Sequence, residues 1–280
     1  MSNYLWIYAL VGLSAGLAGC STPESRNHPT GEASAKTIRL FNGKDLGNFY
    51  TYLQTNKYQD PHGVFSVVQE DGAPAIHVTG QEFGGFVTRG EYENYHLVVE
   101  FKWGTNTWGG RYNKAMDSGI LLHCNGPDGN YAGFWMASVE CQIIEGGCGD
   151  LLMLEGKDAG RPPIKSLLTV ECEQRGKEYW YHPGAPAVTR GEGRFNWYGR
   201  DPQWQDVKGF RGAQDVESPA GQWTRIEAIC DGGNITNIVN GKVVNIGTES
   251  RLQKGKILFQ SEGAEIFYRR IELTPLRDKS

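Results

Sequence analysis

The first 20 residues contain no Asp, Glu, Lys or Arg, although these residues make up 21% of the whole chain. Residues 4–20 (YLWIYALVGLSAGLAGC) form an apolar run that ends among small side chains. The run is short for a membrane-spanning helix, and a polar stretch follows it instead of a stop-transfer pattern. We therefore predict an export signal over residues 1–20.

The end of this run resembles the lipobox of bacterial lipoproteins, in which the cysteine is acylated after cleavage. The matching residues are Leu17, Ala18, Gly19 and Cys20. The resemblance implies lipidation at Cys20, contact with the membrane through the lipid anchor only, and a place in the periplasm or at the outer membrane and cell surface. The alternative is a plain cleaved signal in which a cysteine stands at this position by chance.

Metal-binding motifs are also missing, because no CxxC, HExxH or EF-hand spacing occurs. Asp128 and Asn130, in CNGPDGN (124–130), could hold Ca²⁺ or a similar divalent metal, but Pro-Asp-Gly is equally a turn sequence. Apart from such an ion, no cofactor is expected. Besides Cys20 the chain has an odd number of cysteines in mostly apolar segments, which predicts buried thiols with at least one left free: Cys124, Cys141, Cys148, Cys172 and Cys230.

Runs of basic residues are absent too. The chain has a net charge of −4 and a pI of about 5.9, so we do not expect nucleic acid as a partner. Residues 21–36 (STPESRNHPTGEASAK) are polar and hold two prolines, so we predict a flexible tether. Residues 37–276 are then long enough for one large domain.

Long helical periods are lacking, and glycine, at 38 of 280 residues, divides the chain into short apolar segments. Asn240-Gly241 between two such segments predicts a type I′ hairpin, and Asp231-Gly232-Gly233 predicts another turn. Many short strands with regular turns indicate an all-β, jelly-roll β-sandwich. Residues 173–221 show no strand pattern, so we expect a long functional loop there. Strands are predicted at 37–41, 64–68, 75–79, 84–88, 95–103, 118–124, 138–144, 166–173, 223–230, 234–240, 242–246, 255–260 and 265–273.

Several segments are similar to the 3-keto-disaccharide hydrolase domain family. They include LFNGKDLGNF (40–49), NYHLVVEFKWG (94–104), DSGILLHCNGPDG (117–129), SVECQIIEGGCGD (138–150), KGFRGAQDVESPAGQW (208–223) and KGKILFQSEGAEIFYRRIEL (254–273). The resemblance covers about residues 37–275. It implies a concanavalin A-like jelly roll that acts on glycosides whose sugar ring carries a ketone at C3. It also implies an upstream sugar 3-oxidoreductase as functional partner, since something must make the ketone.

The resemblance also singles out particular positions. Gln260 and Glu262 match the family's second signature strand, and we expect them to border the site; the alternative is a strand end with a solvated turn. The chain departs from many members at His123, where Arg is frequent, and at Glu262, where Asp-His is frequent after the glutamine. If either position takes part in the chemistry, we expect a different substrate or acid–base partner from those of such members.

Alternation in the strands assigns polar side chains to faces. Glu140 and Gln142 share one face of 138–144, Glu100 and Lys102 one face of 95–103, and His123 shares a face with Leu121. We interpret these polar faces as the floor of a substrate groove. The alternative for each is an ordinary solvated face with ion pairs such as Glu100–Lys102.

A ketone at C3 acidifies the proton on C2, so a base can remove it and expel the C1 substituent, after which water adds to the enone. We predict His123 and Glu140 as the acid–base pair, in either order. Donors to the ketone oxygen are expected among Lys102, Gln142 and Arg111.

Two other functions stay open. Glu140-Cys141-Gln142-Ile143-Ile144-Glu145 has the spacing of laminarinase-type retaining endo-glucanases, with Gln in place of their Asp; there a bulge brings both glutamates to one face. The other is a non-catalytic carbohydrate-binding protein that stacks sugars on aromatic residues. The candidate stacking residues are Trp135, Trp180, Tyr181, Trp197, Tyr198 and Trp204.

Overall fold

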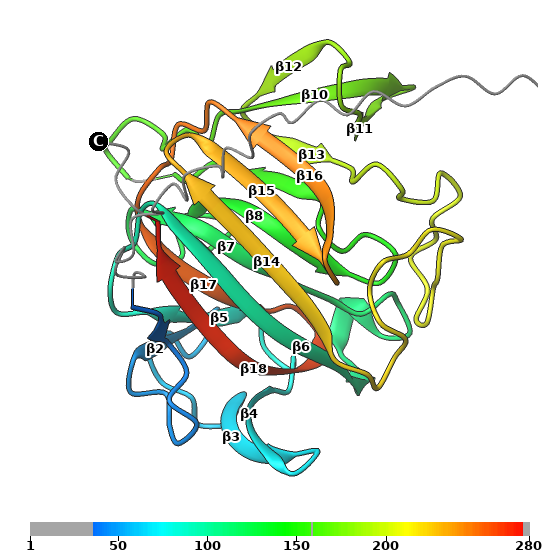
Figure 1. Cartoon of the computed structure of the whole chain (residues 1–280). Helices are drawn as coiled ribbons and strands as arrows, with labels where there is room; N and C mark the ends of the chain where they lie inside the picture. The colour runs from blue at the N-terminus through cyan, green and yellow to red at the C-terminus, as the bar shows by residue number, and fades with distance from the viewer. Residues whose placement is uncertain (1–35, 158, 277–280) are drawn as a thin grey trace, which may run out of the picture. The chain divides into compact units, whose positions relative to one another are not determined.

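Short alternating segments form the strands of the protein in a computed structural model, which describes residues 36–157 and 159–276. The predicted export signal, Cys20 and residues 21–35 of the tether lie outside the described residues. The strands make two antiparallel sheets that pack face to face (Figure 1), so the predicted jelly-roll sandwich is confirmed. Among the described residues, no helix is long and apolar enough to cross a membrane.

The first sheet has 11 strands and stands in front in Figure 1. Two of its strands lie off the main path: β1 (Ile38–Arg39) pairs with β18, and β12 (Ala187–Arg190) pairs with β10. The order along the path is β11 (Glu178–Tyr181), β10 (Leu168–Arg175), β16 (Lys242–Thr248), β15 (Asn234–Val239), β14 (Thr224–Asp231), β6 (Tyr95–Thr107), β18 (Ala264–Pro275), β4 (Ala73–Val78) and β3 (Phe65–Glu70).

The second sheet has seven strands and lies behind the first in the same view. One short 3₁₀ helix, η1 (Gly109–Arg111), follows β6. The strand order is β13 (Gly193–Phe195), β9 (Leu151–Leu154), β8 (Ala137–Ile144), β7 (Asp117–Asn125), β17 (Lys256–Ser261), β5 (Gly84–Thr88) and β2 (Phe49–Leu53).

The core lies between the sheets and takes every second residue of each strand. Val139 and Ile143 of β8 face it from the second sheet, and Val99 of β6 faces it from the first. Phe86 and Phe259 stack at its centre with ring centroids 4.7 Å apart. Each such side chain stabilises the fold by about 1.5–3 kcal/mol through burial. The alternate residues of the second sheet face outwards, and this outer face is the one that carries the candidate site.

Local turn predictions also hold. Asn240 and Gly241, with φ of 46° and 80°, connect β15 to β16 in the left-handed conformation that a type I′ turn requires. Cys124, Cys141, Cys148, Cys172 and Cys230 are buried free thiols, as expected. The prediction of an unstructured stretch over 173–221 is wrong in part, because β11, β12 and β13 lie within it.

Candidate functional site

Carboxyl groups from neighbouring strands meet on the outer face of the second sheet. Glu140 lies on β8, Asp117 opens the adjacent β7, and Glu262 follows β17, the next strand along. Glu140 is 3% exposed and Asp117 6%, whereas Glu262 is half-buried. We refer to these three residues as the carboxylate cluster.

Gly119 makes room for the polar groups of this face. It pairs with Gln142 on β8, and a Cβ placed on it would lie 2.2 Å from Glu140 Oε1 and 2.4 Å from Gln260 Oε1. Real Cβ atoms do not approach other atoms so closely, so a larger residue would displace both side chains. The side chains of Glu140 and Gln260 therefore converge over Gly119.

Several polar atoms around the cluster have no hydrogen-bond partner. A buried unpaired polar group costs about 1–3 kcal/mol, so native structures keep few of them. Here they gather on adjacent residues, which indicates a place where a ligand's hydroxyl or carbonyl groups bind. These atoms are Arg111 Nε, Asp117 Oδ1, Glu140 Oε1, Gln260 Oε1 and Gln260 Nε2.

The environment raises the pKa of every carboxyl in the cluster. Burial, followed by the charge of Asp117, raises the pKa of Glu140 to about 8. Burial raises the pKa of Asp117 to about 7 against the opposing effect of Arg111. Burial and the charges of Asp117 and Glu140 raise the pKa of Glu262 well above its usual value. Groups tuned in this way can give and take protons near neutral pH.

Two arginines supply positive charge at the edges of the cluster. Arg111 is the last residue of η1, and its Nη2 lies 3.4 Å from Asp117 Oδ2. Its guanidinium also donates two hydrogen bonds to Asp206, from Nη1 to Oδ2 at 3.1 Å and from Nη2 to Oδ1 at 2.8 Å. Arg194 lies on β13 opposite Leu152, and Leu152 pairs with Glu140. Either guanidinium is suited to stabilise negative charge on a bound oxygen.

Asp150 orients Arg194 through an ion pair. This aspartate is fully buried, its Oδ2 accepts a hydrogen bond from Arg194 Nη1 at 2.9 Å, and it also binds Arg200. The Trp197 backbone N–H donates to its other oxygen at 2.7 Å. The position of Arg194, which lies across Leu152 of β9 from Glu140, thus depends on one buried carboxylate.

The predicted position of His123 is wrong. β7 and β8 pair regularly as far as Leu122–Val139 and resume at Asn125–Ala137, so β7 carries one extra residue there, and His123 has a φ of 55°. A bulge of this kind shifts the alternation of side chains. His123 therefore points into the core, edge-on to Tyr95.

Its surroundings rule out a role as acid–base partner of Glu140. The His123 Nδ1–H donates to the Leu252 carbonyl at 3.0 Å, and the ring centroid lies 5.4 Å from that of Tyr95, inside the core. Burial lowers the pKa of His123 to about 4, so the ring is neutral at pH 7. Glu140 is on the opposite face of the sheet.

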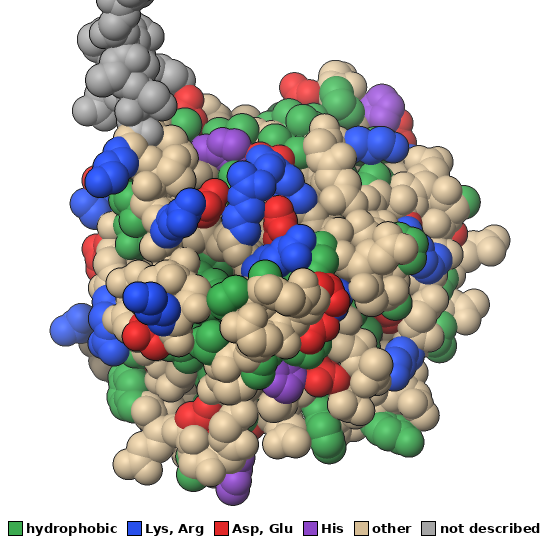
Figure 2. All heavy atoms as spheres, turned by 60° about the horizontal axis from the view of Figure 1, so that its bottom comes forward, with side chains coloured by type: hydrophobic (Ala, Val, Ile, Leu, Met, Phe, Trp, Pro, Cys, Tyr) green, Lys and Arg blue, Asp and Glu red, His purple; other side chains and the backbone are tan. Residues whose placement is uncertain are grey.

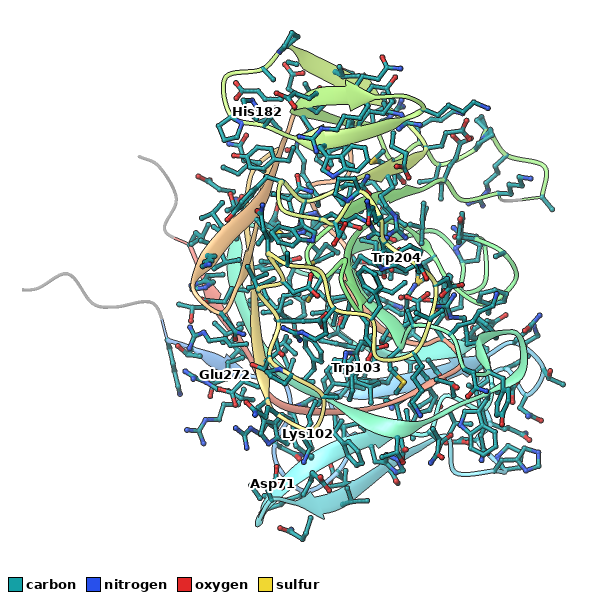
Figure 3. The ribbon with its side chains drawn as sticks, turned by 90° about the vertical axis from the view of Figure 1, so that its right-hand side faces the viewer. Asp71, Lys102, Trp103, His182, Trp204 and Glu272 are labelled. Carbon is teal, nitrogen blue, oxygen red and sulfur yellow. The ribbon has the colours of Figure 1, made fainter. Side chains whose placement is uncertain are left out.

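Glu100 and Lys102 are also away from the cluster, because β6 belongs to the first sheet and they lie on its outer face. Glu100 pairs with Arg269 at 2.7 Å, and Lys102 with Glu70 and Asp71. Figure 3 shows Lys102 beside Asp71, with Trp103 on the other side of the strand. In Figure 2, basic and acidic side chains lie side by side on the surface. The alternative interpretation, an ordinary face with ion pairs, applies to these two residues.

The other predicted site residues are brought together. Arg111, Glu140, Gln142, Gln260 and Glu262 all lie at or beside the cluster on the second sheet. The predicted open groove over Glu140 is absent from the described part of the structure. Residues 131–135 pack over Leu121, Leu258 and Leu152, which neighbour Glu140 on this face of the sheet.

Asp128 and Asn130, the possible calcium ligands, make other contacts. Asp128 accepts hydrogen bonds from the hydroxyls of Tyr50 and Tyr58, and Asn130 Oδ1 accepts one from the Ala137 N–H at 2.7 Å. Across residues 36–157 and 159–276, no group of three or more His, Cys, Asp or Glu side chains could hold a metal ion.

The laminarinase-type arrangement does not form either. β8 pairs with β7 without a bulge from Val139 to Ile144, whereas that arrangement needs one. The Glu145 carboxylate instead accepts the backbone N–H groups of Met116 at 2.9 Å and Gly209 at 2.8 Å. Glu145 therefore holds the loop that precedes β14.

Most of the candidate stacking residues pack inside the protein. Trp135, Trp180, Tyr181 and Trp197 are buried, while Tyr198 is 40% exposed. Trp204 lies in the loop after β13 and donates its indole N–H to the Glu145 carbonyl at 2.8 Å (Figure 3). This set does not form one sugar-binding surface.

Comparisons with known proteins identify the family. The family described as 3-keto-alpha-glucoside-1,2-lyase-like domain matches residues 36–274. The chain belongs to this family. The resemblance found in its sequence motifs is therefore confirmed, and membership supports a carbohydrate-active function of the glycoside hydrolase type.

Solved structures similar to this family member include two from Parabacteroides distasonis that are described as candidate glycosyl hydrolases. One is 22% identical, with a TM-score of 0.45, and the match covers 86% of this chain and 100% of that chain. The other is 18% identical, with a TM-score of 0.47 and coverage of 86% and 94%. A β-glucanase from Bacillus licheniformis is 11% identical, with a TM-score of 0.44 and coverage of 88% and 99%. A comparison with proteins of curated function finds no match.

Proposed function

We propose that this domain cleaves the glycosidic bond of 3-keto-glycosides by elimination followed by hydration. A base takes the proton from C2, and the electron pair of that bond forms the enolate with the C3 ketone. The enolate then expels the C1 oxygen, which takes up a proton as the leaving group departs. Water adds to the resulting enone, its hydroxyl at C1 and its proton at C2, so that the net change is hydrolysis.

Glu140 is the proposed base. Its carboxylate oxygen Oε1 has Gln260 as its polar neighbour but makes no hydrogen bond of normal geometry, and its raised pKa of about 8 makes the ionised form a strong proton acceptor. Arg111 and Arg194 are the proposed donors to the ketone oxygen, where negative charge develops. Asp117 and Glu262, whose pKa values are also raised, are the proposed proton sources for the leaving group. The clustering of unpaired polar atoms around these groups is the observation that carries the proposal.

A surface cavity supports an approach for the substrate. It has a volume of about 790 Å³, and its lining includes Tyr131, Met153 and Gly193. Met153 on β9 pairs with Gly193 on β13, and the next pair along these two strands is Leu152 with Arg194. Leu152 in turn pairs with Glu140 on β8, so the cavity lies next to the strands that lead to the cluster. The pKa of Tyr131 is raised by burial and then by the charges of Glu140 and Glu262. Tyr131, which lines the cavity, is therefore within electrostatic reach of the cluster.

A direct test offers matched glucosides that differ only at C3, one with the ketone and one with the hydroxyl. We expect release of the aglycone, followed by mass spectrometry, from the oxidised compound alone, because only the ketone acidifies the C2 proton. Equal release from both would support a glucanase instead. No release from either would leave a carbohydrate-binding protein.

Replacing Asp117 by Asn is expected to shift the pH dependence of kcat/KM. The charge of Asp117 raises the pKa of Glu140, so its removal lowers that pKa. The base must be ionised, and activity therefore falls below the pKa of Glu140. We expect this acidic limb to move to lower pH by about 1 unit, measured on the oxidised glucoside. The control is Asp201→Asn, on a surface turn, and an unmoved limb in Asp117→Asn would contradict the assignment of Glu140.

A further inference from the structure

A group of tyrosines gathers around one carboxylate at the β2 edge of the second sheet. Tyr50 donates its hydroxyl to Asp128 Oδ1 at 2.6 Å, and Tyr58 donates its hydroxyl to Asp128 Oδ2 at 2.9 Å. Tyr58 also stands edge-on to Tyr52, with ring centroids 5.1 Å apart. Although it is held at these two points, Tyr58 is 63% exposed. An aromatic ring fixed in solvent is already ordered for binding, which reduces the entropy lost when a ligand docks.

Polar groups and a hollow adjoin this ring. Lys256 Nζ donates to the Tyr50 hydroxyl at 3.0 Å. The residues that follow Asp128 in the chain line a cavity of about 540 Å³. A Cβ on Gly129 would lie 2.8 Å from the Tyr52 hydroxyl oxygen, so this turn packs directly on the tyrosines. The cavity is lined by Gly129, Asn130, Tyr131, Ala132, Gly133, Glu155 and Lys157.

The tyrosines lie away from the carboxylate cluster, although the adjoining cavity shares Tyr131, Glu155 and Lys157 with the cavity proposed for substrate approach. Tyr50 lies on β2 and Glu140 on β8, with β5, β17 and β7 between them. Four strand spacings amount to about 19 Å. A sugar ring over Tyr58 therefore cannot touch the groups that would carry out the reaction.

We propose that Tyr58, Asp128 and the adjoining cavity form a second saccharide-binding site, which holds a neutral pyranose residue without reacting with it. The C–H face of a pyranose packs on an aromatic face, and its hydroxyls are suited to the polar groups of the cavity. Both oxygens of Asp128 already accept hydrogen bonds, and Glu155 in the cavity is paired with Lys165 at 2.6 Å. Because these carboxylates are engaged, the site favours a neutral ligand over a cationic one.

The second site goes beyond the proposed reaction, since stacking and hydroxyl contacts need no ketone. Ordinary saccharides should bind to it as well as oxidised ones. Binding there would place a longer glycan across the same face as the carboxylate cluster. Binding to unoxidised polysaccharide and turnover of the oxidised glucoside are measured separately, so failure of one proposal can be told from failure of the other.

The experiment is affinity electrophoresis of the full chain in gels that contain a soluble β-glucan, α-glucan or mannan. We expect at least one polysaccharide to retard the wild type and the Glu140→Gln variant equally. Tyr58→Ala is expected to weaken that binding by at least about tenfold, because the stacking ring is lost. The same variant should turn over a single-ring 3-keto-glucoside at the wild-type rate, because its ring is remote from the cluster.

Matched variants separate this site from other surfaces. Tyr58→Phe keeps the ring and loses the hydrogen bond to Asp128, so an intermediate loss of binding is expected. Tyr198→Ala removes an exposed aromatic residue of another loop and should bind as the wild type does. Unfolding temperatures check that each variant is folded. No retardation of the wild type by any of the three polysaccharides, or equal retardation of Tyr58→Ala, would overturn the second site.

Discussion

Replacing Glu140 by Gln is expected to lower kcat/KM for a 3-keto-glucoside by about 10³-fold, within the range of 10²–10⁴ that a positioned base contributes. Glutamine has nearly the same shape but cannot take the proton from C2. Because the neighbours of Glu140 on the sheet are unchanged, substrate binding should be retained. The loss should therefore appear in kcat rather than in KM, measured by release of the aglycone over time.

The same substitution is expected to stabilise the protein at alkaline pH. The pKa of Glu140 is about 8 in the fold, above its ordinary value of 4.5, so the neutral carboxyl is the favoured form. The stability that the neutral form contributes is complete below pH 4.5 and is lost as the pH rises through 8. Glutamine stays neutral throughout. We expect Glu140→Gln to melt about 3–8 °C higher than the wild type at pH 8.5, and at the same temperature at pH 4.

Glu93→Gln is the matched control, because Glu93 is an exposed acid paired with Lys254. It should change neither the rate nor the pH dependence of melting. If Glu140→Gln kept more than about a tenth of the activity, the base would have to be another residue of the cluster. If it failed to gain stability at pH 8.5, the carboxyl would be ionised at lower pH than its burial implies.

Much of the fold follows from local sequence patterns. Each predicted strand exists, because alternation of apolar residues and glycine turns are local signals. Strands β2, β9, β11, β12 and β13 were not predicted, since most of them are too short to show a period. The place of β13 also depends on a partner distant in the chain, because it pairs with β9.

The candidate site was predictable only where alternation is unbroken. On β8 the pattern placed Glu140 and Gln142 correctly on the outer face. On β7 one extra residue turned His123 into the core, and nothing in the sequence marks a bulge whose left-handed residue is not glycine. For Glu100, alternation gave the correct face of its own strand but could not show that β6 belongs to the other sheet.

The sequence patterns also failed to single out three residues of the site, because their positions depend on strand ends or long-range pairing. They are Asp117, Asp150 and Arg194. Asp117 stands at the first position of its strand, within the segment DSGILLHC that the family resemblance already singled out. That segment was the available signal. Arg194 lies on a strand of three residues, and only the sheet order brings it beside Glu140. The contact between Asp150 and Arg194 depends on the same long-range pairing.

Replacing Asp150 by Asn is expected to be the most destabilising single change at the site. The carboxylate is fully buried and binds Arg200, whose side chain is itself 6% exposed. An amide cannot balance that charge, and removing one partner of a buried ion pair costs about 3–5 kcal/mol. For a domain of this size the melting temperature should fall by about 6–20 °C. Urea unfolding measures the loss, and Asp201→Asn, a surface-turn acid, should show almost none.

A double variant tells whether the loss comes from an uncompensated charge or from the packing of Asp150 itself. Asp150→Leu with Arg200→Met removes both charges, so no buried guanidinium is left without a partner. We expect this protein to be more stable than Asp150→Asn, yet as impaired in kcat/KM, because Arg194 loses the carboxylate that orients it beside Glu140 in both. If stability and activity recovered together, the contact between Asp150 and Arg194 would have no part in positioning the arginine.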